Sequence, residues 1–199
     1  MSLNPIIALA LTLAAGQNVA EVRQLFDAGR YQEVVKTADQ PAIENEEAAR
    51  LQYLKGQSYA KVNDTDGARR AYERLAGSHE KAWASIGKSA LQLIDKQLDE
   101  SLESANQAVS AGDSLPESHY QRGMALMGRK DYPEAATSFT KATQLDPNFA
   151  SAYYYAGLAN YRIKRIDLMT NNFEKFVRLA PNAPERPEID SILRTVRGR

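Results

Sequence analysis

The sequence contains no cysteine and only two histidines among its 199 residues. Without a thiol, the chain can form no disulfide, no thiolate metal site and no cysteine nucleophile. Its charges cancel, because 25 Lys and Arg residues balance 25 Asp and Glu residues, so bulk electrostatics give no reason to expect nucleic-acid binding. The hydrophobic content of 43%, by contrast, is ordinary for a folded chain. These absences exclude several classes of site and leave the fold open.

Recognisable catalytic and metal-binding motifs are also missing. The two histidines, His79 and His119, stand alone, with no His-x3-His or His-Glu-x2-His spacing for a metal ion. The glycines form no phosphate-binding loop, and no serine lies in a G-x-S-x-G turn. We interpret His79 as a surface residue, His119 as a packing residue, and the acidic cluster of Glu44, Glu46 and Glu47 as a solvated helix start. The sequence therefore predicts no enzyme, no cofactor and no metal site.

An apolar run lies at the N-terminus, from Pro5 to Ala15, interrupted only by Thr12. It is too short to cross a bilayer as a helix, so we expect no integral membrane span. Its length and its small-residue ending suit the remnant of a secretory signal, although no Lys or Arg precedes it. A helix packed on the first repeat, or on a neighbouring molecule, suits it equally well. We treat 1–16 as a separate segment and leave export to the periplasm and retention in the cytoplasm as equal alternatives.

The rest of the chain repeats itself with a period of 34 residues. A shift of 34 places six residues on identical ones: Tyr120 on Tyr154, Gly123 on Gly157, Phe139 on Phe173, Lys141 on Lys175, Leu145 on Leu179 and Pro147 on Pro181. Each unit is predicted to be a helix, a turn and a second helix. In the unit 116–149, the first helix has Ser114 as its expected N-cap and ends near Arg129. The second helix runs from Pro133 to Leu145, and Pro147 closes the unit.

This pattern resembles the tetratricopeptide repeat (TPR), whose signature is W-x2-L-G-x2-Y…A-x3-F…P. The signature positions are held in one unit by His119, Gly123, Leu126, Ala135, Phe139, Ala142 and Pro147, and in the next by Tyr153, Ala156, Gly157, Phe173, Phe176 and Pro181. Earlier units are looser, with Gly56, Tyr59, Ala68 and Tyr72 in one and Trp83, Ile86, Gly87, Ala105 and Ala108 in another. Gly56 and Gly87 are 31 residues apart, and Gly87 and Gly123 are 36 apart, so we expect a deletion and an insertion in the intervening turns.

The resemblance implies an all-α fold, a right-handed superhelical α-solenoid of antiparallel helix pairs. We expect five units within 17–183, at about 15–48, 49–79, 80–115, 116–149 and 150–183, the first of them degenerate. A capping helix is expected within 184–199, where Ile189, Ile192, Leu193 and Val196 form one apolar stripe. In such solenoids, the first helix of each unit lines a concave groove.

Three tyrosines, Tyr53, Tyr120 and Tyr154, share one position on three of these first helices. An aromatic stripe at helical spacing usually belongs to the core, but other residues already fill the core positions of the repeat, so we favour the groove. The predicted peptide-binding residues are these three together with Gln57, Lys88, Met124 and Leu158, one turn further on, and Tyr161 beyond them. The basic clamp with which some TPR modules hold acidic tails is not matched at these positions. We therefore expect the groove to prefer apolar or aromatic segments.

The resemblance implies a non-catalytic scaffold that binds a protein or peptide in its groove. Two alternatives remain open at this stage. In one, the apolar N-terminal segment mediates homo-oligomer contacts, because contiguous apolar stretches commonly mark contact surfaces. In the other, more distant alternative, the repeats bind RNA, which the neutral charge and the glycine, alanine and proline pattern both oppose.

Overall fold

The computed structural model describes residues 18–37 and 43–198 of the chain. Within these ranges the regular structure consists of eleven α-helices. They are α2 (Val19–Asp27), α3 (Tyr31–Val35), α4 (Glu46–Lys61), α5 (Thr65–Ala76), α6 (Lys81–Ile94), α7 (Leu98–Ala111), α8 (Pro116–Arg129), α9 (Tyr132–Leu145), α10 (Ala150–Arg162), α11 (Ile166–Leu179) and α12 (Arg186–Arg197). The apolar N-terminal segment, with its predicted export or oligomer role, lies outside the described residues.

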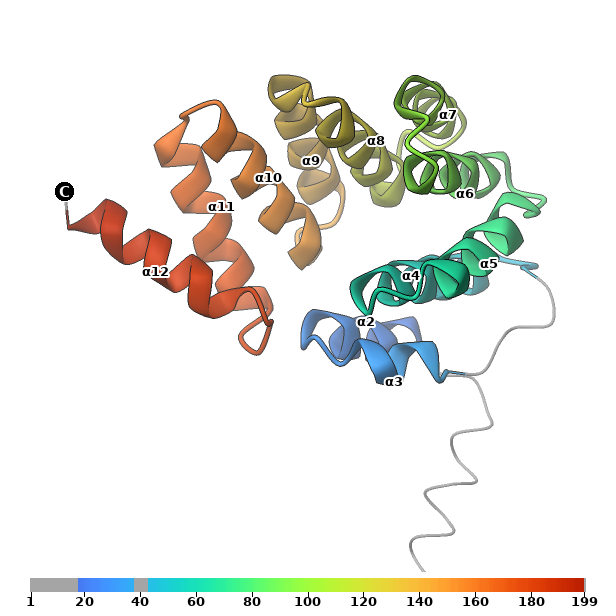
Figure 1. Cartoon of the computed structure of the whole chain (residues 1–199), viewed down its shortest axis with the longest axis horizontal. Helices are drawn as coiled ribbons and strands as arrows, with labels where there is room; N and C mark the ends of the chain where they lie inside the picture. Colours follow the sequence, from blue (N-terminus) through green and yellow to red (C-terminus); the bar gives the residue numbers. More distant parts are fainter. Residues whose placement is uncertain (1–17, 38–42, 199) are drawn as a thin grey trace, which may run out of the picture.

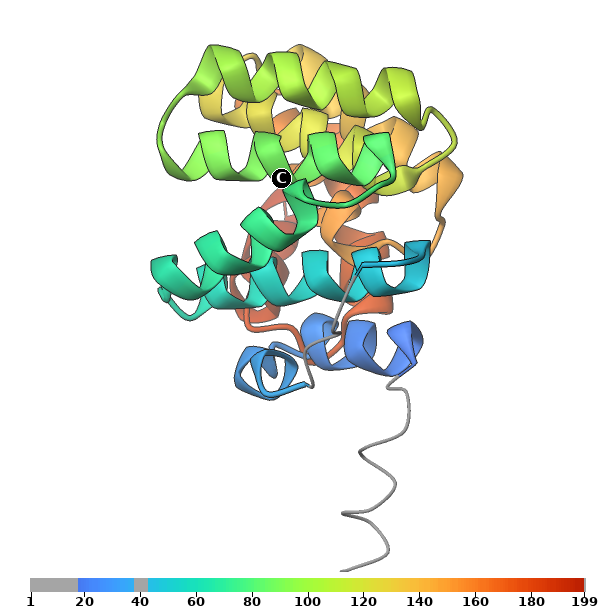
Figure 2. The same cartoon turned by 90° about the vertical axis from the view of Figure 1, so that its right-hand side faces the viewer.

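The helices form antiparallel pairs that stack into a right-handed α-solenoid, as expected from the sequence (Figure 1). Each helix packs against its partner in the pair, and α5, α7 and α9 pack in turn on the first helix of the next pair. The layers are separate in the perpendicular view, where α6 and α7 lie above α4 and α5, and α2 and α3 lie below them (Figure 2). Helix α12 follows the last pair and packs on α11.

One turn geometry recurs inside all five helix pairs. Each turn has a residue with a left-handed backbone, namely Gly29, Asn63, Lys96, Lys130 and Lys164, with φ between 59° and 73°. Successive members are 34, 33, 34 and 34 residues apart. In every case, the amide of the following residue donates a 2.9 Å hydrogen bond to the carbonyl oxygen five residues before it. This bond satisfies a carbonyl group at the end of the first helix and reverses the chain.

The turn positions also define the register of the third pair, and it differs from the predicted register. Gly56, Gly123 and Gly157 each lie seven residues before the left-handed residue of their own turn, and each faces an aromatic ring of the second helix. In α6 this place is occupied by Ser89, whose hydroxyl donates a 2.8 Å hydrogen bond to the carbonyl oxygen of a residue in α7. Gly87 instead lies against the backbone at the end of α5. Aligned on the turns, the chain therefore needs no separate deletion and insertion. It lacks one residue, between Asn63 and Lys96, relative to the 34-residue period.

Small residues allow the paired helices to approach each other closely. At Gly123, an added β-carbon would lie 2.6 Å from the Phe139 ring, so the ring uses the space that a side chain would need. Nine alanines of the described residues have no exposed surface: Ala49, Ala105, Ala108, Ala125, Ala135, Ala142, Ala152, Ala156 and Ala159. The predicted Ser114 N-cap is wrong, because Leu115 holds that position without a side-chain hydrogen bond and Pro116 begins α8. Proline suits this place, since the first amides of a helix have no partner within it.

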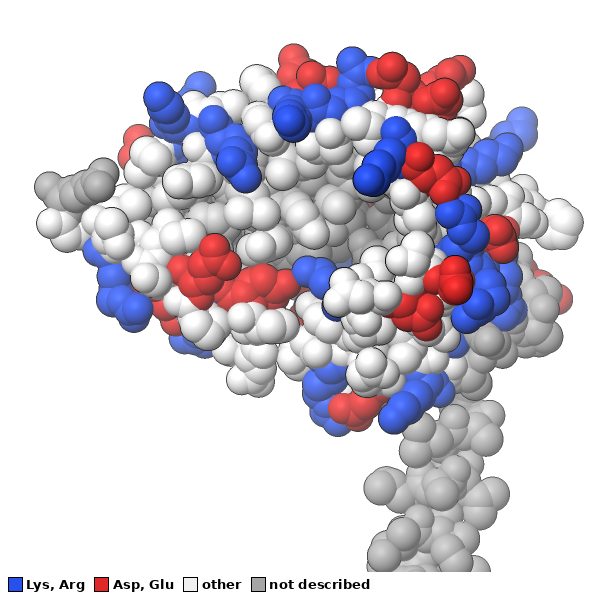
Figure 3. Space-filling view, in the orientation of Figure 1, with Lys and Arg blue, Asp and Glu red and all other residues white. Residues whose placement is uncertain are grey.

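The two ends of the solenoid meet. Gly29, between α2 and α3, packs on Pro184, in the loop between α11 and α12. Beside this contact, the Lys61 ammonium lies 2.8 Å from the Glu185 carboxylate. In Figure 1 the blue N-terminal pair accordingly lies next to the red loop that leads into α12. These contacts close the array into a ring, and its concave side forms a hollow that opens to the surface (Figure 3).

Candidate functional site

A cavity of about 360 Å³ lies on the concave side of the ring. Its walls come from the first helices α2, α4, α6, α8 and α10, with one residue each from α3, α5 and α11 and two from the loop before α12. The space-filling view shows this hollow in the middle of the molecule, with mostly uncharged side chains inside and acidic and basic side chains toward the rim (Figure 3). The volume is sufficient for a small ligand or for one or two side chains of a partner.

Aromatic side chains dominate the lining of the cavity. Eight of them contribute: Phe26, Tyr31, Tyr53, Tyr72, Tyr120, Tyr154, Tyr155 and Phe176. Several meet edge to face, with ring centroids 6.5 Å apart for Tyr53 and Tyr120, 5.8 Å for Tyr120 and Tyr155, and 5.1 Å for Tyr154 and Tyr155. These are preferred geometries for aromatic pairs, so the rings hold one another in place.

The structure brings five of the eight predicted binding residues to this cavity. They are Tyr53, Gln57, Tyr120, Met124 and Tyr154. Tyr53 and Tyr120 are each only 2% exposed and belong to the main hydrophobic core, so they are core residues as well as cavity residues. The Tyr53 hydroxyl donates a 2.8 Å hydrogen bond to Oε1 of Gln121, which fixes the ring from its polar end. Tyr154 lines the cavity and also packs against the Phe176 ring of α11. Gln57 and Met124 are partly exposed.

The other three predicted residues, Lys88, Leu158 and Tyr161, do not line the cavity. Lys88 is exposed, because the register of α6 is displaced by two residues and each residue turns a helix by about 100°. Ala90 is the true counterpart of Gln57 and Met124, and it does line the cavity. Leu158 packs against the apolar cluster of the last helices, and Tyr161 is 52% exposed.

Sequence reasoning missed the charged residues of the cavity, which are Asp27, Lys61 and Glu185. Asp27 and Lys61 each lie two residues before the left-handed residue of their turn, so an alignment on the turns would have found both. Glu185 follows the last pair, and no repeat pattern points to it. Tyr31 and Tyr72, which were not among the predicted binding residues, also line the cavity.

The Lys61 ammonium is the positive centre of the cavity. Besides its ion pair with Glu185, its Nζ atom lies 5.9 Å from the centroids of both the Tyr31 and the Tyr154 rings. Burial alone would lower the pKa of Lys61, but interactions with Tyr155 and Glu185 raise it above the usual value. Lys61 therefore stays charged at neutral pH and is already neutralised by Glu185.

Asp27 differs from Lys61 and Glu185 in its environment. Within residues 18–37 and 43–198, no side chain or amide forms a hydrogen bond or an ion pair with its carboxylate. Burial raises its pKa to about 7, the Arg23 guanidinium opposes that shift, and Asp146 adds to it. Asp27 is therefore a cavity carboxylate that changes its charge near neutral pH.

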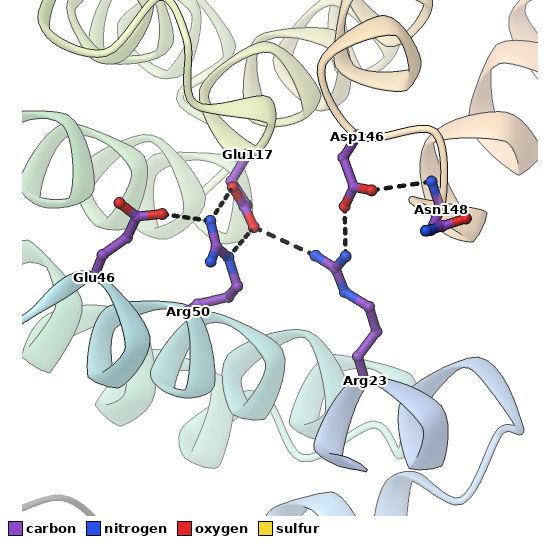
Figure 4. A network of polar contacts seen from close by, with 6 residues as sticks. All are labelled: Arg23, Glu46, Arg50, Glu117, Asp146 and Asn148. Carbon is purple, nitrogen blue, oxygen red and sulfur yellow. Dashed lines mark hydrogen bonds and ion pairs between the residues drawn. The ribbon is translucent and has the colours of Figure 1, made fainter. Parts of the chain in front are cut away.

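A buried ionic network positions α2 beside the cavity (Figure 4). The Glu117 side chain on α8 is almost fully buried, and its Oε1 accepts a 2.6 Å hydrogen bond from Nε of Arg50 on α4. Arg23 on α2 lies 3.5 Å from the same oxygen and 2.5 Å from Asp146, which follows α9. A buried carboxylate requires such partners, because a lone charge is costly to desolvate. The network therefore ties the first helix to the middle of the array.

Neither histidine lines the cavity. His119 is 5% exposed, and its Nε2 lies 2.9 Å from the Asp113 carbonyl oxygen, whereas His79 is exposed, as expected for both. The described part of the chain contains no cluster of three or more potential metal-ligating side chains. The same part has no helix with the length and apolarity that a membrane span requires.

Comparison with known families agrees with the repeat geometry. The Tetratricopeptide repeat model matches residues 53–116, and the TPR repeat model matches residues 123–164. Tetratricopeptide repeat protein 37 of Xenopus laevis is 33% identical over 110 residues, or 52% of this chain. The match covers only 7% of that relative's length, so the chain is similar to a small part of it.

Solved structures show the same fold at low sequence identity. A thermophilic TPR protein of Thermus thermophilus superposes with a TM-score of 0.62 at 15% identity, covering 89% of this chain and 95% of that protein. The first TPR of Spaghetti (RPAP3), bound to the HSP90 peptide SRMEEVD, gives a TM-score of 0.55 at 20% identity over 61% of this chain and 94% of that one.

Proposed function

Because this chain belongs to the tetratricopeptide repeat family, we propose that it is a non-catalytic scaffold that binds a segment of a partner protein in its tyrosine-lined cavity. The observation that carries the proposal is the position of the cavity, since the first helices of all five pairs contribute to it. The repeat thus builds one concave site from residues of similar register rather than several separate surfaces.

The cavity has the properties of an anchoring site for side chains. Its rigid walls are aromatic, which supplies a large contact area with little loss of conformational entropy on binding. Gln57, Gln121 and Ser151 add polar groups to the lining. The proposed division of labour assigns Tyr53 and Tyr120 to the buried floor and Gln57, Met124 and Tyr154 to the walls that a partner reaches.

The partner proposed here differs in charge from the peptide of the similar solved complex. The HSP90 peptide held by the first TPR of Spaghetti has three acidic residues in its sequence. The cavity of this chain has two carboxylates, Asp27 and Glu185, and one cation, Lys61. An acidic tail would therefore meet repulsion, and a segment without acidic side chains suits the lining better.

A substitution that fills the cavity tests the proposal without damaging the core. Ala60 lines the cavity and is exposed, so Ala60→Trp blocks the space and removes no buried contact. Glu103→Trp, on the exposed side of α7, is the matched control for an added indole. Peptides selected on the wild-type chain from a phage-displayed dodecamer library are synthesised and titrated by fluorescence anisotropy.

We expect Ala60→Trp to lower the affinity for the selected peptides by at least about tenfold. Glu103→Trp should leave this affinity unchanged. Circular dichroism should show the same helicity for both variants. If Ala60→Trp binds the peptides as tightly as the wild type, the cavity is not the binding site and the proposed function is wrong.

A further inference from the structure

The charges of the cavity do not cancel. Lys61 and Glu185 form an ion pair with a 2.8 Å separation, which leaves Asp27 as a surplus carboxylate in an aromatic lining. Arg23, one turn earlier on α2, acts on Asp27 only from a distance, because its guanidinium forms its ion pairs with Asp146 and Glu117. When Asp27 is ionised, the cavity as a whole therefore has a net charge of −1.

The aromatic rings already hold one cation. The Lys61 ammonium lies within 6 Å of the Tyr31 and Tyr154 centroids, at 5.9 Å from each. This is the distance at which a cation is attracted by the negative face of a ring. The rings of Tyr53, Tyr120 and Tyr155 add further aromatic surface to the same lining. A second cation would thus find both aromatic surface and a carboxylate.

We propose that the cavity recognises a lysine or arginine side chain of a partner segment, with the cationic group paired to the Asp27 carboxylate and the aliphatic stem packed on the tyrosine rings. The inference rests on the proposed function, and it names the chemistry of the segment that binds. A basic side chain with one apolar neighbour fits a volume of about 360 Å³. The apolar neighbour contacts Leu93, Ile94 and Met124 on the opposite wall.

Alternative occupants satisfy the cavity less well. An acidic side chain would bring like charge to Asp27 and Glu185. A purely apolar side chain would remove water from the Asp27 carboxylate and offer no partner in exchange, which is costly for a charged group. Burial raises the pKa of Asp27 to about 7 although Arg23 opposes the shift, so the free carboxylate is incompletely compensated. Pairing with a ligand cation favours the ionised form of Asp27.

Three fluorescein-labelled peptides that differ at one residue test the proposal by anisotropy: GSLKLSG, GSLQLSG and GSLELSG. For the wild type at pH 8, we expect GSLKLSG to bind about tenfold more tightly than GSLELSG, with GSLQLSG between them. Asp27→Asn should reduce that preference to less than about threefold. Lys61→Met, which removes the internal cation, should increase the preference for GSLKLSG over GSLELSG. Asp66→Asn removes an exposed carboxylate on α5 and should change nothing.

The pH dependence gives a second readout. The charged and titratable groups around Asp27 are Arg23 on its own helix, Tyr31 on α3, Lys61 on α4, Asp146 after α9 and Glu185 before α12. Between pH 6 and pH 8, the wild type should bind GSLKLSG more tightly as Asp27 ionises, and Asp27→Asn should show no such gain.

The outcomes separate this inference from the proposed function. Equal affinity of the wild type for the three peptides, or an unchanged preference in Asp27→Asn, overturns the basic-side-chain inference. If the library peptides remain sensitive to Ala60→Trp in that case, the proposed function stands with a different ligand chemistry. If Ala60→Trp instead leaves the affinity for the library peptides unchanged, the cavity is not the binding site and the proposed function is wrong.

Discussion

Gly29 lies against Pro184, although 155 positions separate them in the chain. A β-carbon on Gly29 would stand 2.6 Å from Cδ of Pro184, and the φ of Gly29 is +73°. Both the space and the backbone conformation therefore require glycine. This contact, with the Lys61–Glu185 ion pair beside it, closes the solenoid into a ring around its cavity.

Replacing Gly29 with alanine should open the ring. We expect Gly29→Ala to lower the free energy of unfolding by about 2 kcal/mol, from backbone strain and loss of the Pro184 contact. Because the chain has no cysteine, Gln32→Cys and Ser191→Cys can carry a dye pair that reports the distance between α3 and α12. Transfer efficiency should fall in Gly29→Ala. Gly77→Ala, at an exposed helix end with an ordinary φ, should leave it unchanged, and equal transfer in Gly29→Ala would contradict the closure.

The Glu117 network should be important for stability. Glu117→Gln leaves Arg50 and Arg23 with reduced compensation in a buried place, so we expect a loss of about 3 kcal/mol in the free energy of unfolding. Glu46→Gln, which removes the exposed partner of Arg50, should cost no more than about 0.5 kcal/mol. Urea unfolding followed by circular dichroism measures both values. A similar small effect for the two variants would show that the network contributes little.

Asp27 should make stability depend on pH. Its pKa of about 7 in the folded chain exceeds the ordinary value of 3.8, so the folded state keeps a proton that the unfolded chain releases. Stability of the wild type should therefore decrease as pH rises from about 4 to about 7. Asp27→Asn removes this loss, and we expect it to be more stable than the wild type by about 2 kcal/mol at pH 8. Urea titrations at pH 5, 6, 7 and 8 test this, and parallel curves for the two proteins would refute it.

The left-handed lysines should be sites of stabilisation. Lys130, Lys96 and Lys164 have positive φ, which strains a residue with a β-carbon. Lys130→Gly should therefore raise the free energy of unfolding by about 0.5 kcal/mol. Lys88→Gly, in the middle of α6, should lower it by about 1 kcal/mol, because glycine there weakens a helix. Thermal unfolding of both variants provides the test, and a loss of stability in Lys130→Gly would argue against the turn geometry.

The tyrosines of the predicted groove should not behave alike. The Tyr120 ring packs on Phe139, Phe149 and Tyr155. Tyr120→Ala should therefore lower the free energy of unfolding by about 4 kcal/mol. Tyr161→Ala, at a half-exposed position, should change stability by less than about 0.5 kcal/mol. A binding test with Tyr120→Ala would therefore report unfolding as well as recognition. Comparable stability for the two variants in urea would show that Tyr120 is not a core residue.

The sequence alone determined the repeat, the fold class and the approximate bounds of the two helices in the unit 116–149. These properties follow from local patterns, such as the apolar spacing of a helix, the small residues between paired helices and the proline that ends a unit. For that reason the turn at Lys130 and the helix that ends at Leu145 could be predicted from neighbouring residues. The same reasoning failed at α6, because it aligned Gly87 with Gly123, whereas the turn residue Lys96 defines the register.

Only the tertiary structure decided where the concave side closes and which charges lie inside it. The ring depends on small rotations between successive helix pairs, which add up along the array. The sequence pattern of a single repeat does not reveal these rotations. Its closing contacts join residues that are far apart in the sequence, namely Lys61 with Glu185 and Gly29 with Pro184. The lack of cysteine, metal motifs and net charge therefore excluded many functions, but the surplus carboxylate of Asp27 became visible only when the two ends met.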